Sequence, residues 1–167
     1  MSRSPITAQP LTNGTKLPDF SLTDAENRLI NISTLRGATG TIIAFIHGTW
    51  CPYCVRQLNR LNRAAPELFE RGCGLICFTH DPADSLYAYQ LSAQPPLAYA
   101  LLADPEPSLS HAFGIYDPEH EAPYPAVFYA NASDTILYSD VSSDPDCFPN
   151  MERLLEVVRA GTNNILV

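Results

Sequence analysis

The chain has 167 residues, of which 46% are apolar, enough for one domain with its own core. Its 10 basic residues stand against 18 acidic ones, so the net charge is −8, and Lys16 is the only lysine. Proteins that bind nucleic acid usually carry a basic stripe, and docking on anionic lipid also requires cations. The acidic balance therefore argues against both classes.

The sequence predicts neither an export signal nor a membrane span. The stretch after Met1 is polar and holds two prolines, and no run of about 18 apolar residues occurs. We therefore expect a cytoplasmic protein. In that reducing compartment the five cysteines are more often catalytic, metal-binding or buried than joined in structural disulfides.

The N-terminal part predicts an arm followed by a β-hairpin. Residues 1–16 have little periodicity and indicate a mobile arm, and residues 17–167 form the predicted domain. Short alternating stretches at 20–23 and 28–32 flank a polar turn, which is typical of a hairpin.

A buried strand followed by a long helix comes next. Residues 41–46 are apolar and β-branched, which predicts a strand buried on both faces. From Pro52 to Gly72 the apolar residues recur at helical spacing. The opposite, solvated face of this helix carries Arg56, Arg60 and Arg63.

The remaining elements alternate between strands and helices. We expect strands at 74–79, 99–103, 126–129 and 135–138, the last two forming a hairpin. We expect helices at 81–91, capped by Asp81 or Asp84, at 104–113, and from Met151 to Gly161. This order predicts an α/β sandwich with a mixed sheet.

The most informative motif lies where the first buried strand ends and the long helix begins. It reads His47-Gly48-Thr49-Trp50-Cys51-Pro52-Tyr53-Cys54. A Cys-x-x-Cys pair in this context indicates a dithiol redox site. The helix N-terminus favours the thiolate form of Cys51, so we expect Cys51 to attack a disulfide and Cys54 to resolve the mixed disulfide.

Two other interpretations of the cysteines were weighed. A zinc site would require two further ligands, and Cys73 and Cys77 lie on a strand rather than in a tight turn. The other alternative is that both motif thiols are structural and take part in no redox reaction. We interpret Cys73 and Cys77 as core residues, and Cys147 as an inert surface thiol or a remote resolving thiol.

With these residues placed, the chain resembles the alkyl hydroperoxide reductase/thiol-specific antioxidant (AhpC/TSA, peroxiredoxin-like) family. The similar segments are Leu17–Leu22, Leu35–Gly37, the motif Gly48–Cys54, Leu102–Pro105 with Ala112–Gly114, and Tyr124–Ala126. The resemblance implies a thioredoxin-like three-layer sandwich with a mixed central sheet, helices on both faces and an N-terminal β-hairpin.

The resemblance also implies a substrate groove. Pro125 matches the position of the thioredoxin fold's cis-proline, so we expect a cis bond after Tyr124. The groove would then be shaped by Trp50, Tyr53, Tyr124 and Pro125. His47 and Thr49 are candidates for support of the Cys51 thiolate.

The chain departs from the family's peroxidatic sites at two points. Gly48 stands three residues before Cys51, where those sites place Thr or Ser. No arginine occurs between Arg71 and Arg153, although such sites use one near the cis-proline strand. These departures favour a thiol–disulfide oxidoreductase over a thiol peroxidase, and a redox-silent binding module is a third hypothesis.

The resemblance implies no cofactor and no metal. The expected partners are a thiol or disulfide protein substrate, or a hydroperoxide, together with a thiol electron donor. A homodimer is left open.

Overall fold

The computed structural model describes residues 9–144 and 146–163. The strands are β1 (Ser21–Thr23), β2 (Leu29–Asn31), β3 (Gly40–Ile46), β4 (Cys73–Thr79), β5 (Ala100–Ala103), β6 (Tyr116–Asp117), β7 (Ala122–Pro123), β8 (Ala126–Asn131) and β9 (Ile136–Val141). The helices are α1 (Pro52–Glu70), α2 (Ala83–Ser92), α3 (Ser108–Ala112), α4 (Met151–Asn163) and the short 3-10 helix η1 (Ile32–Thr34).

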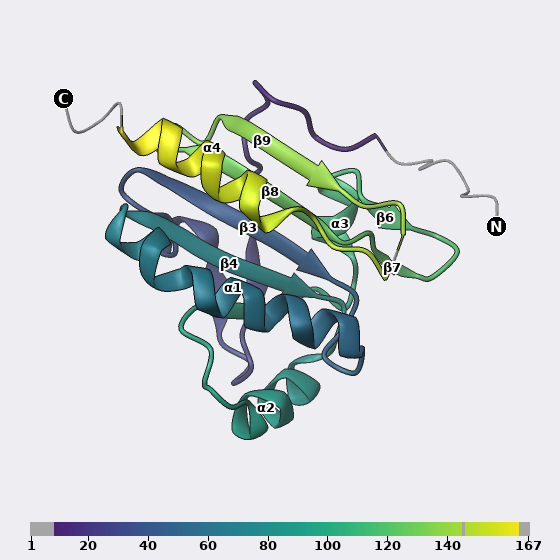
Figure 1. Ribbon diagram of the computed structural model, residues 1–167. Coiled ribbons are helices and arrows are strands. Elements are labelled where there is room, and N and C mark those ends of the chain that lie inside the picture. Colours follow the sequence, from purple (N-terminus) through teal and green to yellow (C-terminus); the bar gives the residue numbers. More distant parts are fainter. Residues whose placement is uncertain (1–8, 145, 164–167) are drawn as a thin grey trace.

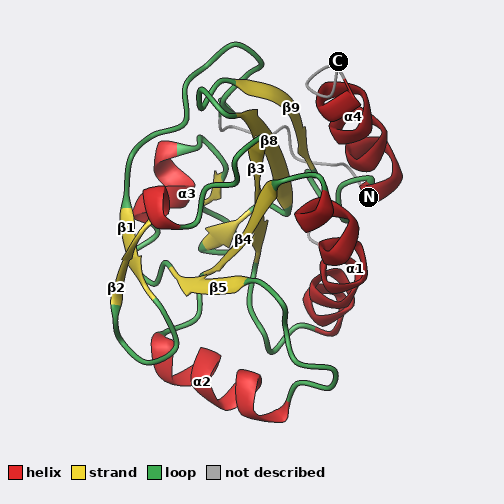
Figure 2. Ribbon diagram, turned by 90° about the vertical axis from the view of Figure 1, so that its left-hand side faces the viewer, coloured by secondary structure: helices red, strands yellow, loops and turns green. Residues whose placement is uncertain are grey.

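Seven strands form one mixed sheet with helices on both faces. The strand order is β2-β1-β5-β4-β3-β8-β9, and β6 pairs with β7 separately. Helices α1 and α4 lie side by side over one face, and α3 lies on the other (Figures 1 and 2). This arrangement confirms the predicted three-layer sandwich. No helix among the described residues is long and apolar enough to cross a bilayer.

The core alternates between the two faces of the sheet because neighbouring side chains of a strand point in opposite directions. In β3, Ile42, Ala44 and Ile46 belong to the apolar cluster that includes α1 and α4. Ile43 and Phe45 belong to the cluster on the other face, which contains α3. Burial on both faces explains why β3 has a continuous apolar sequence.

The strand register determines what lies at the end of β3. Strand β3 runs parallel to β4, with Ile46 opposite Thr79. It runs antiparallel to β8, with Phe45 opposite Ala126. The segments after β3, after β4 and before β8 therefore meet at one edge of the sheet, and α1 begins there (Figure 1).

The N-terminal hairpin is confirmed, and residues 9–16 of the predicted arm contact the domain. Strands β1 and β2 pair antiparallel, as expected. Within residues 9–16, Leu11 N donates to Phe113 O, Gly14 N donates to Ile136 O, and Ile136 N donates to Thr15 O. These backbone bonds hold the segment against the domain. Residues 1–8 of the predicted arm lie outside the described residues.

Two smaller expectations also need correction. The last helix does not stop at Gly161 but continues to Asn163. A Cβ at position 161 would stand 3.2 Å from the Tyr129 hydroxyl, so glycine here permits a close approach of helix and sheet rather than ending the helix. The two-residue strands β6 and β7 were not predicted, since two residues are too short for a periodic pattern.

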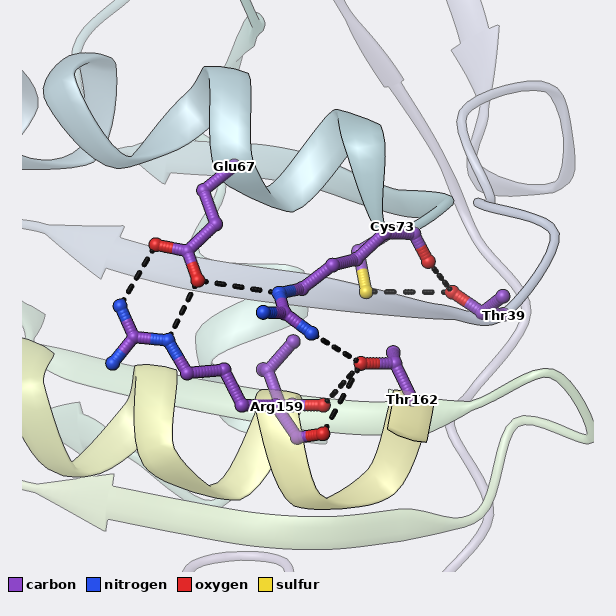
Figure 3. Close-up of polar contacts among 7 residues, drawn as sticks. Thr39, Glu67, Cys73, Arg159 and Thr162 are labelled. Carbon is purple, nitrogen blue, oxygen red and sulfur yellow. Dashed lines mark hydrogen bonds and ion pairs between the residues drawn. The ribbon is translucent and has the colours of Figure 1, made fainter. Parts of the chain in front are cut away.

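A polar network joins α1 to α4 at the end of α1 remote from Cys51 (Figure 3). Arg159 on α4 donates two hydrogen bonds to the Glu67 carboxylate, at 2.6 and 2.9 Å. Arg71 donates to Glu67 at 3.2 Å and to the Thr162 hydroxyl at 3.1 Å. The hydrogen bonds from Arg159 and then from Arg71 lower the pKa of Glu67 to about 2.

This network predicts a pH-dependent contribution to stability. Glu67→Gln should lower the free energy of unfolding by about 1 kcal/mol at neutral pH, because the pair is partly exposed. The pKa of Glu67 is lower in the folded chain than in the unfolded chain, so the contribution is complete above about pH 4.5 and is lost as the pH falls toward 2. Urea titrations at several pH values measure this difference.

The matched control is Glu70→Gln, which removes an exposed carboxylate from the same helix end. It should change the stability little at any pH. A difference between wild type and Glu67→Gln that stays constant down to pH 3 would contradict the prediction.

Candidate active site

Cys51 occupies the N-cap of α1, with Pro52 as the first helical residue. The Cys51 N–H closes a turn onto Gly48 O at 3.2 Å, and the Cys51 carbonyl accepts the first helical bond from Val55 N at 3.0 Å. The first turn of α1 has N–H groups without helical partners, and the Cys51 side chain makes no capping hydrogen bond to them. The structure therefore places Cys51 as the sequence predicts.

Cys54 lies one turn further into the helix and is buried beneath Cys51. Its side chain is 0% exposed, whereas Cys51 is 6% exposed. Burial raises the pKa of the Cys54 thiol, and the neighbouring Cys51 thiol adds to the rise. Cys51 and Cys54 are not joined in a disulfide here. The more accessible Cys51 is suited to attack, and the buried Cys54 is suited to resolve a disulfide formed at Cys51.

The buried carboxylate of Asp81 holds the loop that precedes Cys51. Its Oδ2 accepts hydrogen bonds from Thr49 N at 2.6 Å and from the Thr79 hydroxyl at 2.7 Å. The expected capping of α2 by Asp81 or Asp84 is wrong, because the N-cap is Pro82 and no side chain caps the helix. Asp81 points instead toward the neighbouring strand end, where the parallel strands β3 and β4 finish together.

Gly48 lies between the Trp50 indole and the Asp81 carboxylate. A Cβ at position 48 would stand 2.2 Å from Trp50 Nε1 and 3.0 Å from Asp81 Oδ1. The indole is exposed and would have to swing away before a Thr or Ser fitted here. The local packing therefore leaves no room for a side chain at position 48, which agrees with the presence of glycine where peroxidatic sites have Thr or Ser.

His47 and the loop between β6 and β7 form a second polar group at this edge. The His47 ring stacks on His120 with centroids 6.2 Å apart, and His120 Nδ1 lies 2.6 Å from the Asp117 carboxylate. His47 is 7% exposed, and its buried Nε2 has no hydrogen-bond partner among the residues that the structure describes. Burial and then His120 lower the pKa of His47, which favours neutral imidazole at pH 7. A charged His47 supporting the thiolate is therefore not favoured.

Tyr124 and Pro125 lie beside the end of β3, but the expected cis bond between them is wrong. The cis peptide found among the described residues is Gln94–Pro95. Tyr124 N donates to Ile115 O, and Ser142 N donates to Pro125 O, both at 2.8 Å. These bonds continue the β7 backbone into β8, which a trans bond allows. Tyr124 is buried, and burial raises its pKa, with Asp117 and Glu119 adding to the rise.

The exposed aromatic residues of the motif are Trp50 and Tyr53. Trp50 is 74% exposed and Tyr53 is 38% exposed, so both are available to a substrate at the rim of the site. The Thr49 hydroxyl makes no hydrogen bond among those described, and Thr49 contributes its backbone N–H to Asp81.

Of the other cysteines, Cys77 lies in the core near Cys54, and Cys147 lies at the surface. Cys73 and Cys77 are buried in β4, and burial raises both of their pKa values, in line with the predicted core role. Cys147 is exposed in the loop before α4. Within the described part of the chain, no three His, Cys, Asp or Glu side chains are grouped to bind a metal ion.

Two relatives with assigned names match parts of the chain. The 1-Cys peroxiredoxin of Onchocerca volvulus is 30% identical over 124 residues, covering 66% of this chain and 53% of that protein. The thiol-disulfide oxidoreductase ResA of Bacillus anthracis is 32% identical over 71 residues, covering 42% of this chain and 40% of that protein. The chain thus spans about half the length of these relatives, or less.

A solved structure and a family profile cover more of the chain. The crystal structure of Enterococcus faecalis AhpC superposes with a TM-score of 0.81 at 22% identity, covering 90% of this chain and 92% of that one. This likeness supports the thioredoxin-like fold. The profile of the AhpC/TSA family matches residues 13–139, which include the whole Cys51–Cys54 motif and most of the sheet. The chain therefore belongs to the AhpC/TSA family.

Proposed function

We propose that this chain is a thiol–disulfide oxidoreductase that uses Cys51 and Cys54 as its dithiol. The observation that carries the proposal is the pair itself: Cys51 at the N-terminus of α1 is 6% exposed, and Cys54, one turn further along, is fully buried. A disulfide between them would close across a single helical turn. The relative named ResA, which is a thiol-disulfide oxidoreductase, lends further support.

The reaction proceeds in two exchange steps. The Cys51 thiolate attacks one sulfur of a substrate disulfide, and the other substrate sulfur leaves as a thiolate that takes up a proton. Cys54 loses its proton and attacks Cys51 Sγ, which releases the second substrate thiol. The substrate gains two electrons, and the protein keeps a Cys51–Cys54 disulfide. A thiol donor then reduces that disulfide by the reverse exchange.

A thiol peroxidase is the second candidate, and family membership favours it. In this reaction the Cys51 thiolate attacks a hydroperoxide oxygen, which gives an alcohol or water and a sulfenic acid on Cys51. The Cys54 thiol then condenses with the sulfenic acid, releasing water and forming the same disulfide. Gly48, which replaces the Thr or Ser of peroxidatic sites, is the reason to rank this reaction second.

The two functions separate in a comparison of oxidants. The reduced protein is mixed with a disulfide-bonded peptide or with hydrogen peroxide, and formation of the Cys51–Cys54 disulfide is followed by mass spectrometry. We expect the peptide to oxidise the protein rapidly, and hydrogen peroxide to react with Cys51 no faster than with a free thiol at the same thiolate fraction. A peroxide reaction about 10³-fold faster than a free thiol would reverse the ranking.

A further inference from the structure

The exposed face of α1 carries three arginines that no carboxylate neutralises. Arg56, Arg60 and Arg63 are exposed, and among the described residues no Asp or Glu lies within ion-pair distance of them. Every other described arginine is bound to an acid; these are Arg28, Arg36, Arg71, Arg153 and Arg159. Unneutralised cations are unexpected in a chain with a net charge of −8.

These arginines lie in one row that begins at the active site. Residues 53, 56, 60 and 63 are three or four positions apart, which places them on one face of the helix. The guanidinium of Arg56 lies over the Tyr53 ring, 4.6 Å from its centroid. We call Arg56, Arg60 and Arg63 the arginine stripe. It extends about 18 Å from Cys51, given the rise of an α-helix.

The acid that would continue this row is already bound elsewhere. Glu67 follows Arg63 by one helical turn, where an ion pair along the helix would be expected. Its carboxylate binds Arg159 of α4 and Arg71 instead (Figure 3). The network between the helices therefore leaves the stripe open to an external anion.

A groove with mixed polar and apolar lining runs beside the stripe. It has a volume of about 610 Å³ and separates the exposed side of α1 from the start of α4. Arg60, Arg63 and Glu67, whose carboxylate is bound by Arg159, line the groove from α1. The half-buried side chains of Phe148, Met151 and Leu155 line it from the side of α4, together with the exposed Glu152. Arginines beside apolar side chains can bind carboxylates and an apolar side chain of the same segment.

We propose that the arginine stripe and its groove dock an acidic segment of a partner protein, and that a thiol or disulfide of this partner reacts at Cys51. The choice of this partner rests on the proposed function. Guanidinium groups pair with carboxylates in a planar, two-bonded geometry. An extended chain advances about 3.4 Å per residue, so Arg56 would meet an acid about two residues from the partner's cysteine. Arg63 would meet one about five residues away.

The charge of the whole chain favours a short acidic peptide segment over a nucleic acid. A polyphosphate would extend past the three arginines into the field of an acidic protein, and affinity for nucleic acids depends on the number of phosphates neutralised. An acidic segment of a few residues is attracted by the three arginines. It is too short to extend far into the region where the acidic residues of the chain would repel it.

The test measures binding without any thiol chemistry. Two cysteine-free synthetic peptides of equal length, one rich in Glu and one rich in Lys, are titrated into the reduced protein by calorimetry, with the fluorescence of Trp50, the single tryptophan, as a second readout. We expect the Glu peptide to bind at least about 10-fold more tightly than the Lys peptide. Arg60→Gln/Arg63→Gln should weaken Glu-peptide binding about 10-fold.

The matched control, Lys16→Gln/Arg28→Gln, removes the same charge far from α1 and should keep the affinity for the Glu peptide. Equal binding of both peptides, or equal weakening in the control and stripe variants, would overturn the proposal. Tighter binding of an oligothymidylate of the same charge would overturn it in favour of nucleic acid. If the Glu peptide binds as expected but no disulfide exchange occurs, the docking surface stands and the proposed function fails.

Discussion

Cys51→Ser is expected to slow reduction of a disulfide-bonded peptide by at least about 10³-fold, because the hydroxyl is not ionised at neutral pH and cannot attack the disulfide. Cys54→Ser should keep the first exchange step and accumulate a mixed disulfide between Cys51 and the peptide. Burial of Cys54 beneath Cys51 leaves it unable to reach a protein disulfide directly. Mass spectrometry after rapid acid quenching measures both species.

Cys147→Ser is the control for the third candidate thiol. Cys147 lies on the surface before α4, outside the motif, and its replacement should leave the exchange rate near that of the wild type. If Cys147→Ser accumulates the mixed disulfide and Cys54→Ser does not, then Cys147 resolves. If Cys51→Ser still forms a mixed disulfide through Cys54, the assignment of the attacking sulfur is wrong.

The sequence predicts the scaffold well because the scaffold depends on local patterns. Strand β3 has an uninterrupted apolar run because it is buried on both faces, and the change to helical spacing after Pro52 marks α1. Each of these signals is contained in a short, continuous stretch of sequence. The two motif cysteines are recognisable for the same reason, since their spacing is set by a single helical turn.

The parts of the site that sequence analysis missed depend on register between segments far apart in the chain. Asp81 follows a strand in a Thr-x-Asp pattern, and its position suggested a helix cap. Only the pairing of Ile46 with Thr79 brings it to the Thr49 backbone, 32 residues away. The useful signal was its place after the strand next to β3, because parallel strands end at the same edge of a sheet.

The expectation of a cis bond at Pro125 failed for a related reason. It was carried over from the resemblance, whereas the isomer of an X–Pro bond is set by the surrounding backbone contacts. Here the bonds of Tyr124 N and Pro125 O continue one extended path from β7 to β8. The neutral state favoured for His47 also depends on a tertiary contact, because His120 comes from a loop 73 residues further along the chain.

Replacement of Asp81 should affect both stability and reactivity. Asp81→Ala leaves the partly buried Thr49 N–H and the buried Thr79 hydroxyl without their acceptor, and we expect a loss of about 3 kcal/mol in the free energy of unfolding. The loop from Gly48 to Cys51 also loses the bond that fixes its position. A displacement of about 1 Å can cost about 10²-fold in rate, so peptide reduction should fall by up to that factor.

Two further variants distinguish the positioning of the loop before Cys51 from the effect of the Asp81 charge and from a loss of global stability. Asp81→Asn keeps one oxygen that can accept both hydrogen bonds, so its rate should fall much less than that of Asp81→Ala. Ile136→Ala creates a cavity at the opposite end of the sheet and should cost about 2–5 kcal/mol without moving the loop. Rates are measured well below the midpoint of unfolding of each variant. If Ile136→Ala slows the reaction as much as Asp81→Ala does, the effect of Asp81 is on global stability alone. If Asp81→Ala is slow while Asp81→Asn and Ile136→Ala are not, the hydrogen bonds of Asp81 position the loop that presents Cys51.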